Sequence, residues 1–320
     1  MRAQHMSRAR SVAASTLREM GVRADAIPLE GPLEGGSEGS SVIVEPLEAG
    51  RARFTKAFFE YEGGRFGGPK AMGFRARDED YMDVPVPSYL VRHPTAGPML
   101  IDTGLHPSVA RDPSHNMGRR AAGWFSLEAG SDVTSQLRER GLGPGDIEVV
   151  VLTHLHLDHA SAISEFPEST FVVSEAEWEH ATNLRFPMLE GYRPAHYDHA
   201  VDYRTVDFGA DYVDSYGPFG RTVDLFGDGT VRLAFTPGHT PGHMSVLLRL
   251  PRRDFVVLSD VAYTWRQFDG GPEPWRPADR HNWRRSLHEA QAYRRAYPYA
   301  LVVPGHDQEF WDKLEPRYEE

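Results

Sequence analysis

Residues 153–160 read Thr-His-Leu-His-Leu-Asp-His-Ala, which places four potential metal ligands within six positions. On an extended backbone alternate side chains point the same way, so His154 and His156 can present their imidazoles on one side. Asp158 and His159 follow where the chain is expected to turn into a short helix, so they can face a second metal beside the first. Surface histidines on a loop are the alternative interpretation, but such a dense cluster favours two adjacent metal ions.

Predicted strands lead into this cluster and into three further potential ligands. Residues 147–152 are Ile-Glu-Val-Val-Val-Leu, a run typical of a strand buried on both faces in a sheet covered by helices. The other ligands also follow predicted strands: His239 after 230–235, Asp260 after 254–258, and His306 after 299–303. Proline and glycine around His239 predict a tight, rigid loop. Asp260 is the natural bridging ligand, because a carboxylate has two oxygens and can bind two cations.

These motifs resemble those of the metallo-β-lactamase-fold hydrolases, and more narrowly of their N-acyl-homoserine lactonase-like branch. The resemblance runs from about Val84 to the C-terminus. It implies an α/β fold, the αββα sandwich, with the metal site at one edge. It also implies that the Asp-Thr-Gly sequence at 102–104 closes an early strand beside the metals, with Asp102 supporting the ligands from outside and His243 doing the same.

The resemblance implies a site for two divalent metal ions with an activated hydroxide between them. The expected ligands are His154, His156 and His239 for one metal, Asp158, His159 and His306 for the other, and Asp260 for both. Nitrogen and oxygen ligands suit Zn²⁺ best, although Mn²⁺, Fe²⁺ and Co²⁺ also fit. Two cations lower the pKa of a shared water from about 15.7 toward neutrality, so no protein nucleophile is required.

Two side chains are expected to act in catalysis. Asp158 is the expected proton carrier, because a ligand carboxylate can keep one oxygen close to the water and to the leaving group. Tyr263 lies three positions after Asp260, where the lactonase-like enzymes carry a tyrosine whose hydroxyl binds the substrate carbonyl. A phenol aimed at a developing oxyanion typically contributes about 3 kcal/mol. Packing alone is the alternative role for Tyr263.

Composition narrows the function further. The net charge is −11, which disfavours nucleic acid as a partner because phosphate binding needs clustered lysine and arginine. The chain has no cysteine, which excludes disulfides, thiolate metal sites and a cysteine nucleophile. No apolar run approaches the roughly 18 residues of a membrane span, and none fits a signal peptide. We therefore expect a cytoplasmic protein that acts on a small ester or lactone, and the sequence leaves a homodimer open.

The predicted domain organisation has three parts. Residues 1–45 form an N-terminal extension and linker, with a short helix at 7–21, and residues 46–320 form the hydrolase domain. Residues 178–226 are rich in aromatic side chains without a clear period, which predicts an irregular insertion that forms a lid or substrate wall. Aromatic residues that only hold this segment on the core are the alternative.

Other elements follow from local patterns. We expect strands at 53–61, 84–93, 99–101, 170–174 and 244–250, and helices at 131–140, 175–183 and 279–297, with a glycine-rich loop at 63–73.

The preferred function is a dinuclear lactonase of the acyl-homoserine-lactone type, a quorum-quenching activity. A thioester, phosphotriester or sulfate-ester hydrolase on the same scaffold is the alternative, and a metal-binding module without catalysis is a lesser one.

Overall fold

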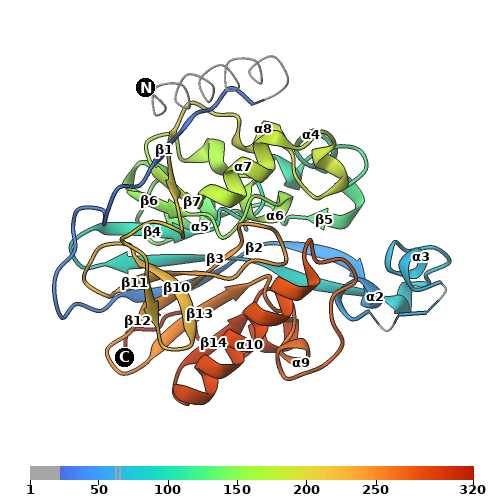
Figure 1. Ribbon diagram of the computed structural model, residues 1–320. Coiled ribbons are helices and arrows are strands. Elements are labelled where there is room, and N and C mark those ends of the chain that lie inside the picture. Colours follow the sequence, from blue (N-terminus) through green and yellow to red (C-terminus); the bar gives the residue numbers. More distant parts are fainter. Residues whose placement is uncertain (1–21, 62, 65) are drawn as a thin grey trace, which may run out of the picture.

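The computed structural model describes residues 22–61, 63–64 and 66–320 (Figure 1). Two β-sheets lie between two layers of helices, with α7 (Glu175–Asn183) on one side and α10 (Arg280–Ala296) on the other. The predicted αββα sandwich is therefore confirmed. No helix in these ranges combines the length and the apolar character needed to cross a membrane.

Among the described residues, the larger sheet has eight strands in the order β1-β8-β7-β6-β4-β3-β2-β5, and the smaller has six in the order β14-β13-β12-β11-β10-β9. The larger sheet consists of β1 (Ala26–Pro28), β2 (Ile43–Thr55), β3 (Tyr81–His93), β4 (Gly97–Ile101), β5 (Phe125–Ser126), β6 (Val149–Val151), β7 (Thr170–Ser174) and β8 (Asp202–Val206). The smaller sheet consists of β9 (Asp214–Tyr216), β10 (Phe219–Asp224), β11 (Val231–Phe235), β12 (Met244–Arg249), β13 (Asp254–Ser259) and β14 (Leu301–Pro304).

The other helices are mostly short. They are α2 (Lys56–Phe59), α3 (Gly67–Ala71), α4 (Pro113–Met117), α5 (Val133–Glu139), α6 (Leu157–Ala160), α8 (Pro194–Tyr197), α9 (Trp265–Phe268) and α11 (Gln308–Trp311). The predicted strand at 170–174 and helix at 175–183 have the observed bounds.

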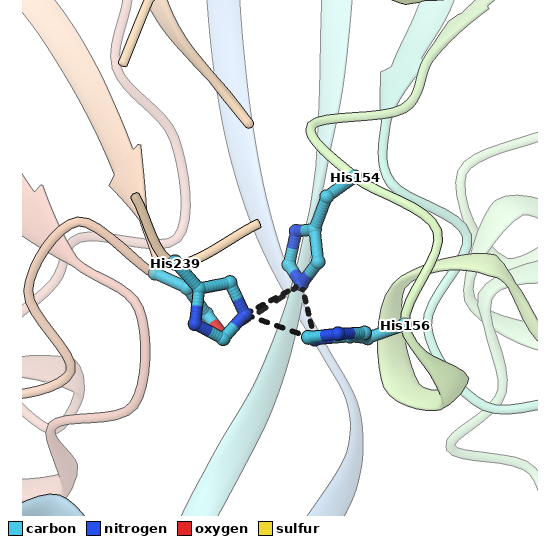
Figure 2. A group of neighbouring side chains, drawn as sticks. His154, His156 and His239 are labelled. Carbon is cyan, nitrogen blue, oxygen red and sulfur yellow. Dashed lines mark hydrogen bonds and ion pairs between the residues drawn. The ribbon is translucent and has the colours of Figure 1, made fainter. Parts of the chain in front are cut away.

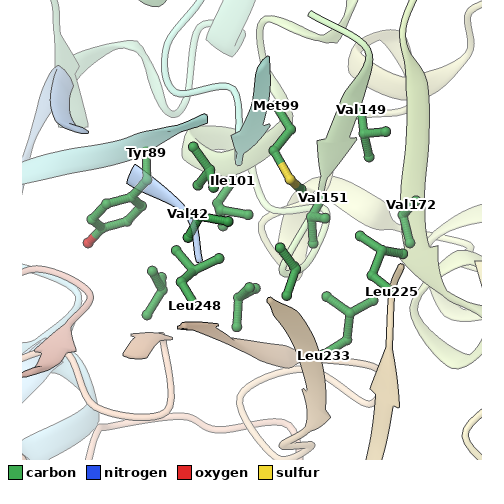
Figure 3. Packing of buried hydrophobic residues seen from close by; sticks show 14 of the residues in the cluster. Val42, Tyr89, Met99, Ile101, Val149, Val151, Val172, Leu225, Leu233 and Leu248 are labelled. Carbon is green, nitrogen blue, oxygen red and sulfur yellow. The ribbon is translucent and has the colours of Figure 1, made fainter. Parts of the chain in front are cut away.

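Aliphatic side chains from both sheets meet in the centre of the sandwich. Met99, Ile101 and Val151 of the larger sheet lie in one buried cluster with Leu233 and Leu248 of the smaller sheet (Figure 3). Separate buried clusters lie under α5 and α7 on one side and under α9 and α10 on the other. Because β6 is buried on both faces, all three of its residues are valine, and the first polar side chains come after the strand ends.

The described part of the predicted N-terminal extension belongs to the sandwich. β1 pairs in parallel with β8, and Leu29, Val42 and Val44 are buried in the central core. The predicted helix at 7–21 lies outside the described residues, and the division at residue 45 stays a prediction. Glycine and serine between 31 and 41 suggest a linker, but the apolar residues on both sides of this segment pack against the sheets.

Two local predictions were wrong. The strand predicted at 53–61 ends at Thr55 and is followed by α2, while the loop predicted at 63–73 contains α3. The Phe54 and Phe58 rings stack with their centroids 4.7 Å apart, a contact across four positions that an extended strand would prevent.

Residues 178–226 are not an irregular insertion. This segment contains β8 of the larger sheet and β9 and β10 of the smaller one, so it connects the two halves of the sandwich. Trp178 packs on Tyr203 with ring centroids 4.6 Å apart, which holds α7 on the sheet. The structure of residues 178–226 depends on pairing with distant strands, which local sequence periodicity does not reveal. Within the segment, Tyr192 forms a β-bridge with the predicted ligand His156, and the Gly191 carbonyl accepts the N–H of Leu157.

Candidate metal centre

The seven predicted metal ligands converge at one edge of the sandwich, although they are spread over residues 154–306. Each lies in a loop or short helix that begins where a strand of one of the two sheets ends. They follow β6, β11, β13 and β14, in the order in which the sequence presents them. The side chains fall into two groups, one of His154, His156, His239 and Asp260, and one of Asp158, His159 and His306.

Three imidazoles of the first group point their ring nitrogens at a common centre (Figure 2). His239 Nε2 lies 3.2 Å from His154 Nε2 and 2.9 Å from His156 Nδ1, and the last two atoms are 3.1 Å apart. A tetrahedral ion with metal–nitrogen distances of about 2.0 Å requires nitrogens about 3.3 Å apart. The spacing of the three nitrogens therefore fits a single divalent cation between them.

Asp260 joins the first group to the second. Its Oδ2 lies 3.0 Å from His239 Nε2, and its Oδ1 lies 3.2 Å from His306 Nε2 and 3.6 Å from His159 Nε2. Asp158 Oδ2 lies 3.6 Å from His306 Nε2 and 3.7 Å from His159 Nε2. One carboxylate thus presents an oxygen to each group, as the bridging role requires.

Two atoms of this centre are buried without a hydrogen-bond partner, namely His159 Nε2 and Asp260 Oδ1. Buried polar atoms are nearly always satisfied, so an orphan nitrogen and an orphan oxygen aimed at one point indicate a missing partner. Both atoms are good ligands for zinc and for similar divalent cations. The donor set therefore fits two such ions.

Hydrogen bonds outside the two groups orient the imidazoles. His159 Nδ1 donates to Asp102 Oδ2 at 2.8 Å, and His306 Nδ1 donates to the Pro85 carbonyl oxygen at 2.8 Å. Both contacts place the ring proton on Nδ1 and leave the Nε2 lone pair free for a metal. Thr153 donates from its backbone and its hydroxyl to Asp102, at 2.7 and 2.8 Å, which fixes that carboxylate in turn. His243 Nε2 accepts the backbone N–H of Asp260 at 3.1 Å, so His243 supports the site from outside.

The backbone is strained or tightly packed where it approaches the ligands. Asp102 and Ser259 adopt φ values of 59° and 50°, which are uncommon for residues other than glycine. Gly305 precedes His306 and leaves no room for a side chain, because an added Cβ would lie 2.8 Å from Asp260 Oδ1. Tertiary packing therefore holds these turns against their local preference.

Burial and charge divide the histidines into two kinds. Burial, together with neighbouring imidazoles, lowers the pKa values of His154 and His156 well below the usual range, so both are neutral and ready to bind a metal. Burial also disfavours charge on His159, but the nearby carboxylates outweigh it and raise its pKa to about 10. The second group therefore attracts a positive charge, which a proton supplies when no metal is bound.

Tyr263 lies beside the first group. Its hydroxyl oxygen is 3.1 Å from His239 Nδ1, and its side chain is buried. Because His239 Nε2 faces the metal position, Nδ1 carries the proton and donates to Tyr263, which leaves the tyrosine proton free. Burial and the carboxylates of Asp260 and Asp158 raise the pKa of Tyr263 well above 10, so the phenol stays protonated.

The aromatic side chains that pack on Tyr263 come from a part of the chain that we did not single out. Phe58 and Phe59 of α2 lie 6.2 and 5.2 Å from it between ring centroids. Residues 178–226, the predicted lid or substrate wall, do not supply these contacts, and Phe186 of this segment is 59% exposed. The four-residue spacing of Phe54 and Phe58 matches one helical turn and is a sequence signal for the turn of chain that leads into α2.

Comparisons with known proteins agree with this geometry. A model of the metallo-beta-lactamase superfamily matches residues 81–306. The N-acyl homoserine lactonase AttM of Agrobacterium fabrum is 35% identical over 234 residues, which are 72% of this chain and 85% of AttM. An N-acyl homoserine lactonase of Bacillus cereus is 27% identical over 191 residues, 59% of this chain and 68% of the relative.

Solved structures share the fold. An N-acyl homoserine lactone hydrolase with the product N-hexanoyl-L-homoserine at its catalytic metal center has a TM-score of 0.67 at 19% identity, covering 88% of this chain and 98% of that one. The dizinc quorum-quenching lactonase AidC has a TM-score of 0.57 at 15% identity, covering 86% and 90%.

Proposed function

The chain belongs to the metallo-beta-lactamase superfamily, and from that premise we propose that it is a dinuclear metal-dependent lactonase that opens the ring of N-acyl homoserine lactones. The observation that carries the proposal is the pair of ligand groups that share Asp260, with the Tyr263 hydroxyl at their side. A phenol donor next to a two-metal site is suited to an ester carbonyl.

The proposed ligands divide between two ions. His154, His156 and His239 would hold one ion and Asp158, His159 and His306 the other, and Asp260, whose two oxygens face the two groups, would serve both. We propose zinc for both positions, since their imidazole and carboxylate ligands match its preference. When bound, the ions supply a nucleophile at neutral pH and polarise the ester carbonyl.

Two residues of the chain handle the changing charge and the proton. Tyr263 stays neutral and its proton is free, so it donates a hydrogen bond to the carbonyl oxygen as negative charge develops there. Asp158 has a partly accessible carboxylate, with 13% of its side chain exposed, on the edge of the second group. It takes the proton released on attack and returns it to the ring oxygen, which stays attached to the opened product.

The proposed substrate is a small molecule. A net charge of −11 disfavours nucleic acid, which needs a basic surface. Opening acyl-homoserine lactones would remove signalling molecules, so the proposed cellular role is quorum quenching. A cytoplasmic location and a homodimer stay predictions.

A proton-release assay over a substrate panel tests the proposal. Zinc-reconstituted protein is assayed with acyl-homoserine lactones, thioesters and phosphotriesters, and its zinc content is measured in the same preparation. We expect two zinc ions per chain and the highest kcat/KM on the lactones. His306→Ala should lose zinc and activity, whereas His288→Ala, which changes an exposed histidine of α10, should lose neither. Protein with two zinc ions that hydrolyses thioesters or phosphotriesters but no lactone would refute the substrate class.

A further inference from the structure

Glu177 is a fully buried carboxylate that is outside both ligand groups. It is the third residue of α7, and its side chain points at the loops that carry the histidines of the first group. The Leu155 backbone N–H donates to Oε1 at 3.0 Å, the Tyr192 hydroxyl donates to Oε1 at 2.9 Å, and the Gly242 backbone N–H donates to Oε2 at 3.2 Å. Glu177 thus accepts three hydrogen bonds from three separate segments.

Each of these donors lies in the same loop as a predicted ligand or packs against one. Leu155 lies between His154 and His156, and Gly242 lies three residues after His239 in the same tight loop. The Tyr192 ring packs edge-on against His156, with their centroids 4.6 Å apart. One carboxylate therefore connects the backbone or packing partner of all three histidines in the first group.

The loop around Gly242 is pressed against the start of α7. A Cβ added to Gly242 would lie 2.0 Å from the Glu177 backbone nitrogen and 2.4 Å from Ser174 Oγ, so only glycine fits this approach. Ser174 Oγ donates to the Gly242 carbonyl oxygen at 2.5 Å and accepts the Glu177 N–H at 3.1 Å. The Ser174 hydroxyl thus fastens the loop to the start of α7 with one hydrogen bond, and the Glu177 side chain supplies a second.

Sequence alone suggests a different role for this residue. The order Ser-Glu-Ala-Glu at 174–177 matches a capping box, in which the glutamate side chain returns to the backbone of the capping serine. In the structure Ser174 does cap the helix, but the Glu177 side chain binds the ligand loops instead. A carboxylate suits this position because it accepts at both oxygens and donates at neither.

We propose that Glu177 is a positioning residue that holds the end of β6 and the His239 loop at the separation the first metal ion needs. The inference rests on the proposed function, because it takes the first ligand group to be a metal site. Glu177 belongs to neither ligand group, and it acts through the backbone of Leu155 and Gly242. Outer partners of metal ligands typically contribute about 10–100-fold to metal affinity.

Glu177→Gln tests the role with little change in volume. If the amide oxygen keeps the contacts of Leu155 and Tyr192, the NH₂ group faces the Gly242 N–H, and two donors oppose each other. The reverse orientation of the amide places the NH₂ group against the Leu155 N–H and the Tyr192 hydroxyl, which are also donors. Either way one side of the connection is lost, so we expect the first ligand group to bind Zn²⁺ about 10–100-fold more weakly.

Chelator competition with Zn²⁺ measures this affinity in two backgrounds. In His306→Ala only the first group is complete, and Glu177→Gln should weaken it by at least about tenfold. In His239→Ala the second group remains, and the same change should alter its affinity by less than about twofold. The matched control is Glu45→Gln, another buried glutamate, which pairs with Arg92, Arg140 and Arg317 away from the site. It should leave both affinities unchanged.

Tyr192→Phe provides a variant that keeps the ring on His156 and removes the hydroxyl that donates to Glu177. We expect it to weaken the first group by a few-fold, and this variant decides the question if Glu177→Gln does not fold. Equal losses at both groups, or a first group unchanged by the folded Glu177 or Tyr192 variant, would overturn the inference and leave the proposed function standing. Wild-type protein that binds no zinc would overturn both.

Discussion

Asp102→Asn isolates the electrostatic support of the second ligand group. Asp102 accepts the Nδ1 proton of His159 at 2.8 Å and both donors of Thr153. Asparagine has nearly the same shape and tolerates the positive φ of 59° at this position, so the backbone turn is retained. The substitution therefore changes charge and hydrogen bonding while leaving the fold intact.

The expected loss follows from those contacts. The side-chain oxygen of the introduced asparagine can keep the Thr153 backbone N–H, which puts its NH₂ group opposite His159 Nδ1. His159 then moves its proton to Nε2, the atom aimed at the second metal. A hydrogen bond to a charged group contributes about 1.5–3 kcal/mol, which equals about 10–150-fold in affinity. The negative charge of Asp102 also stabilises a proton on His159, and that proton competes with the metal. A divalent cation carries twice the charge of a proton, so the carboxylate attracts it about twice as strongly.

Zinc affinity at pH 8, measured by chelator competition, checks this value. We expect the second zinc ion of Asp102→Asn to bind about 10–150-fold more weakly, with the first ion little affected. Asp132→Asn is the matched control, since Asp132 is buried and accepts hydrogen bonds from Thr134 and Ser135 at the start of α5. An Asp102→Asn protein that binds its second zinc within about twofold of wild type would refute the reasoning.

Three further outcomes are expected. Tyr263→Phe should lower kcat for lactones by about 10²–10³ with little change in KM, and a decrease of less than twofold in the proton-release assay would contradict its role. Burial lowers the pKa of His196 from 6.5 to about 3, so its neutral form stabilises the fold above pH 6.5 and this contribution is lost as the pH falls from 6.5 toward 3. Urea unfolding of metal-free His196→Gln should show a weaker pH dependence in that range, and an unchanged slope would count against this. His159 has a pKa of about 10 without metal, so zinc binding at pH 8 should release roughly one proton from it. Calorimetry in buffers of different ionisation enthalpy measures that release, and its absence would show that His159 is already neutral.

Local pattern and long-range pairing contributed differently to the fold. The strand at 170–174 was predictable from its run of aromatic and β-branched residues, and the helix at 175–183 from the capping Ser174 that precedes it. Residues 178–226 were misread because β8 and β10 gain their stability from partners in two different sheets. No period within the segment reports such partners.

The candidate site shows the same division. The sequence was enough to predict which residues are ligands and that they follow strands. Divalent metals of this kind require histidine and carboxylate, and side chains become exposed at the edge of a sheet where its strands end. The distances between groups, the tautomer fixed by Asp102 and the three hydrogen bonds of Glu177 join residues far apart in the chain. Only folding brings these atoms together. Their contacts depend on how the two sheets pack and on how closely α7 approaches the His239 loop.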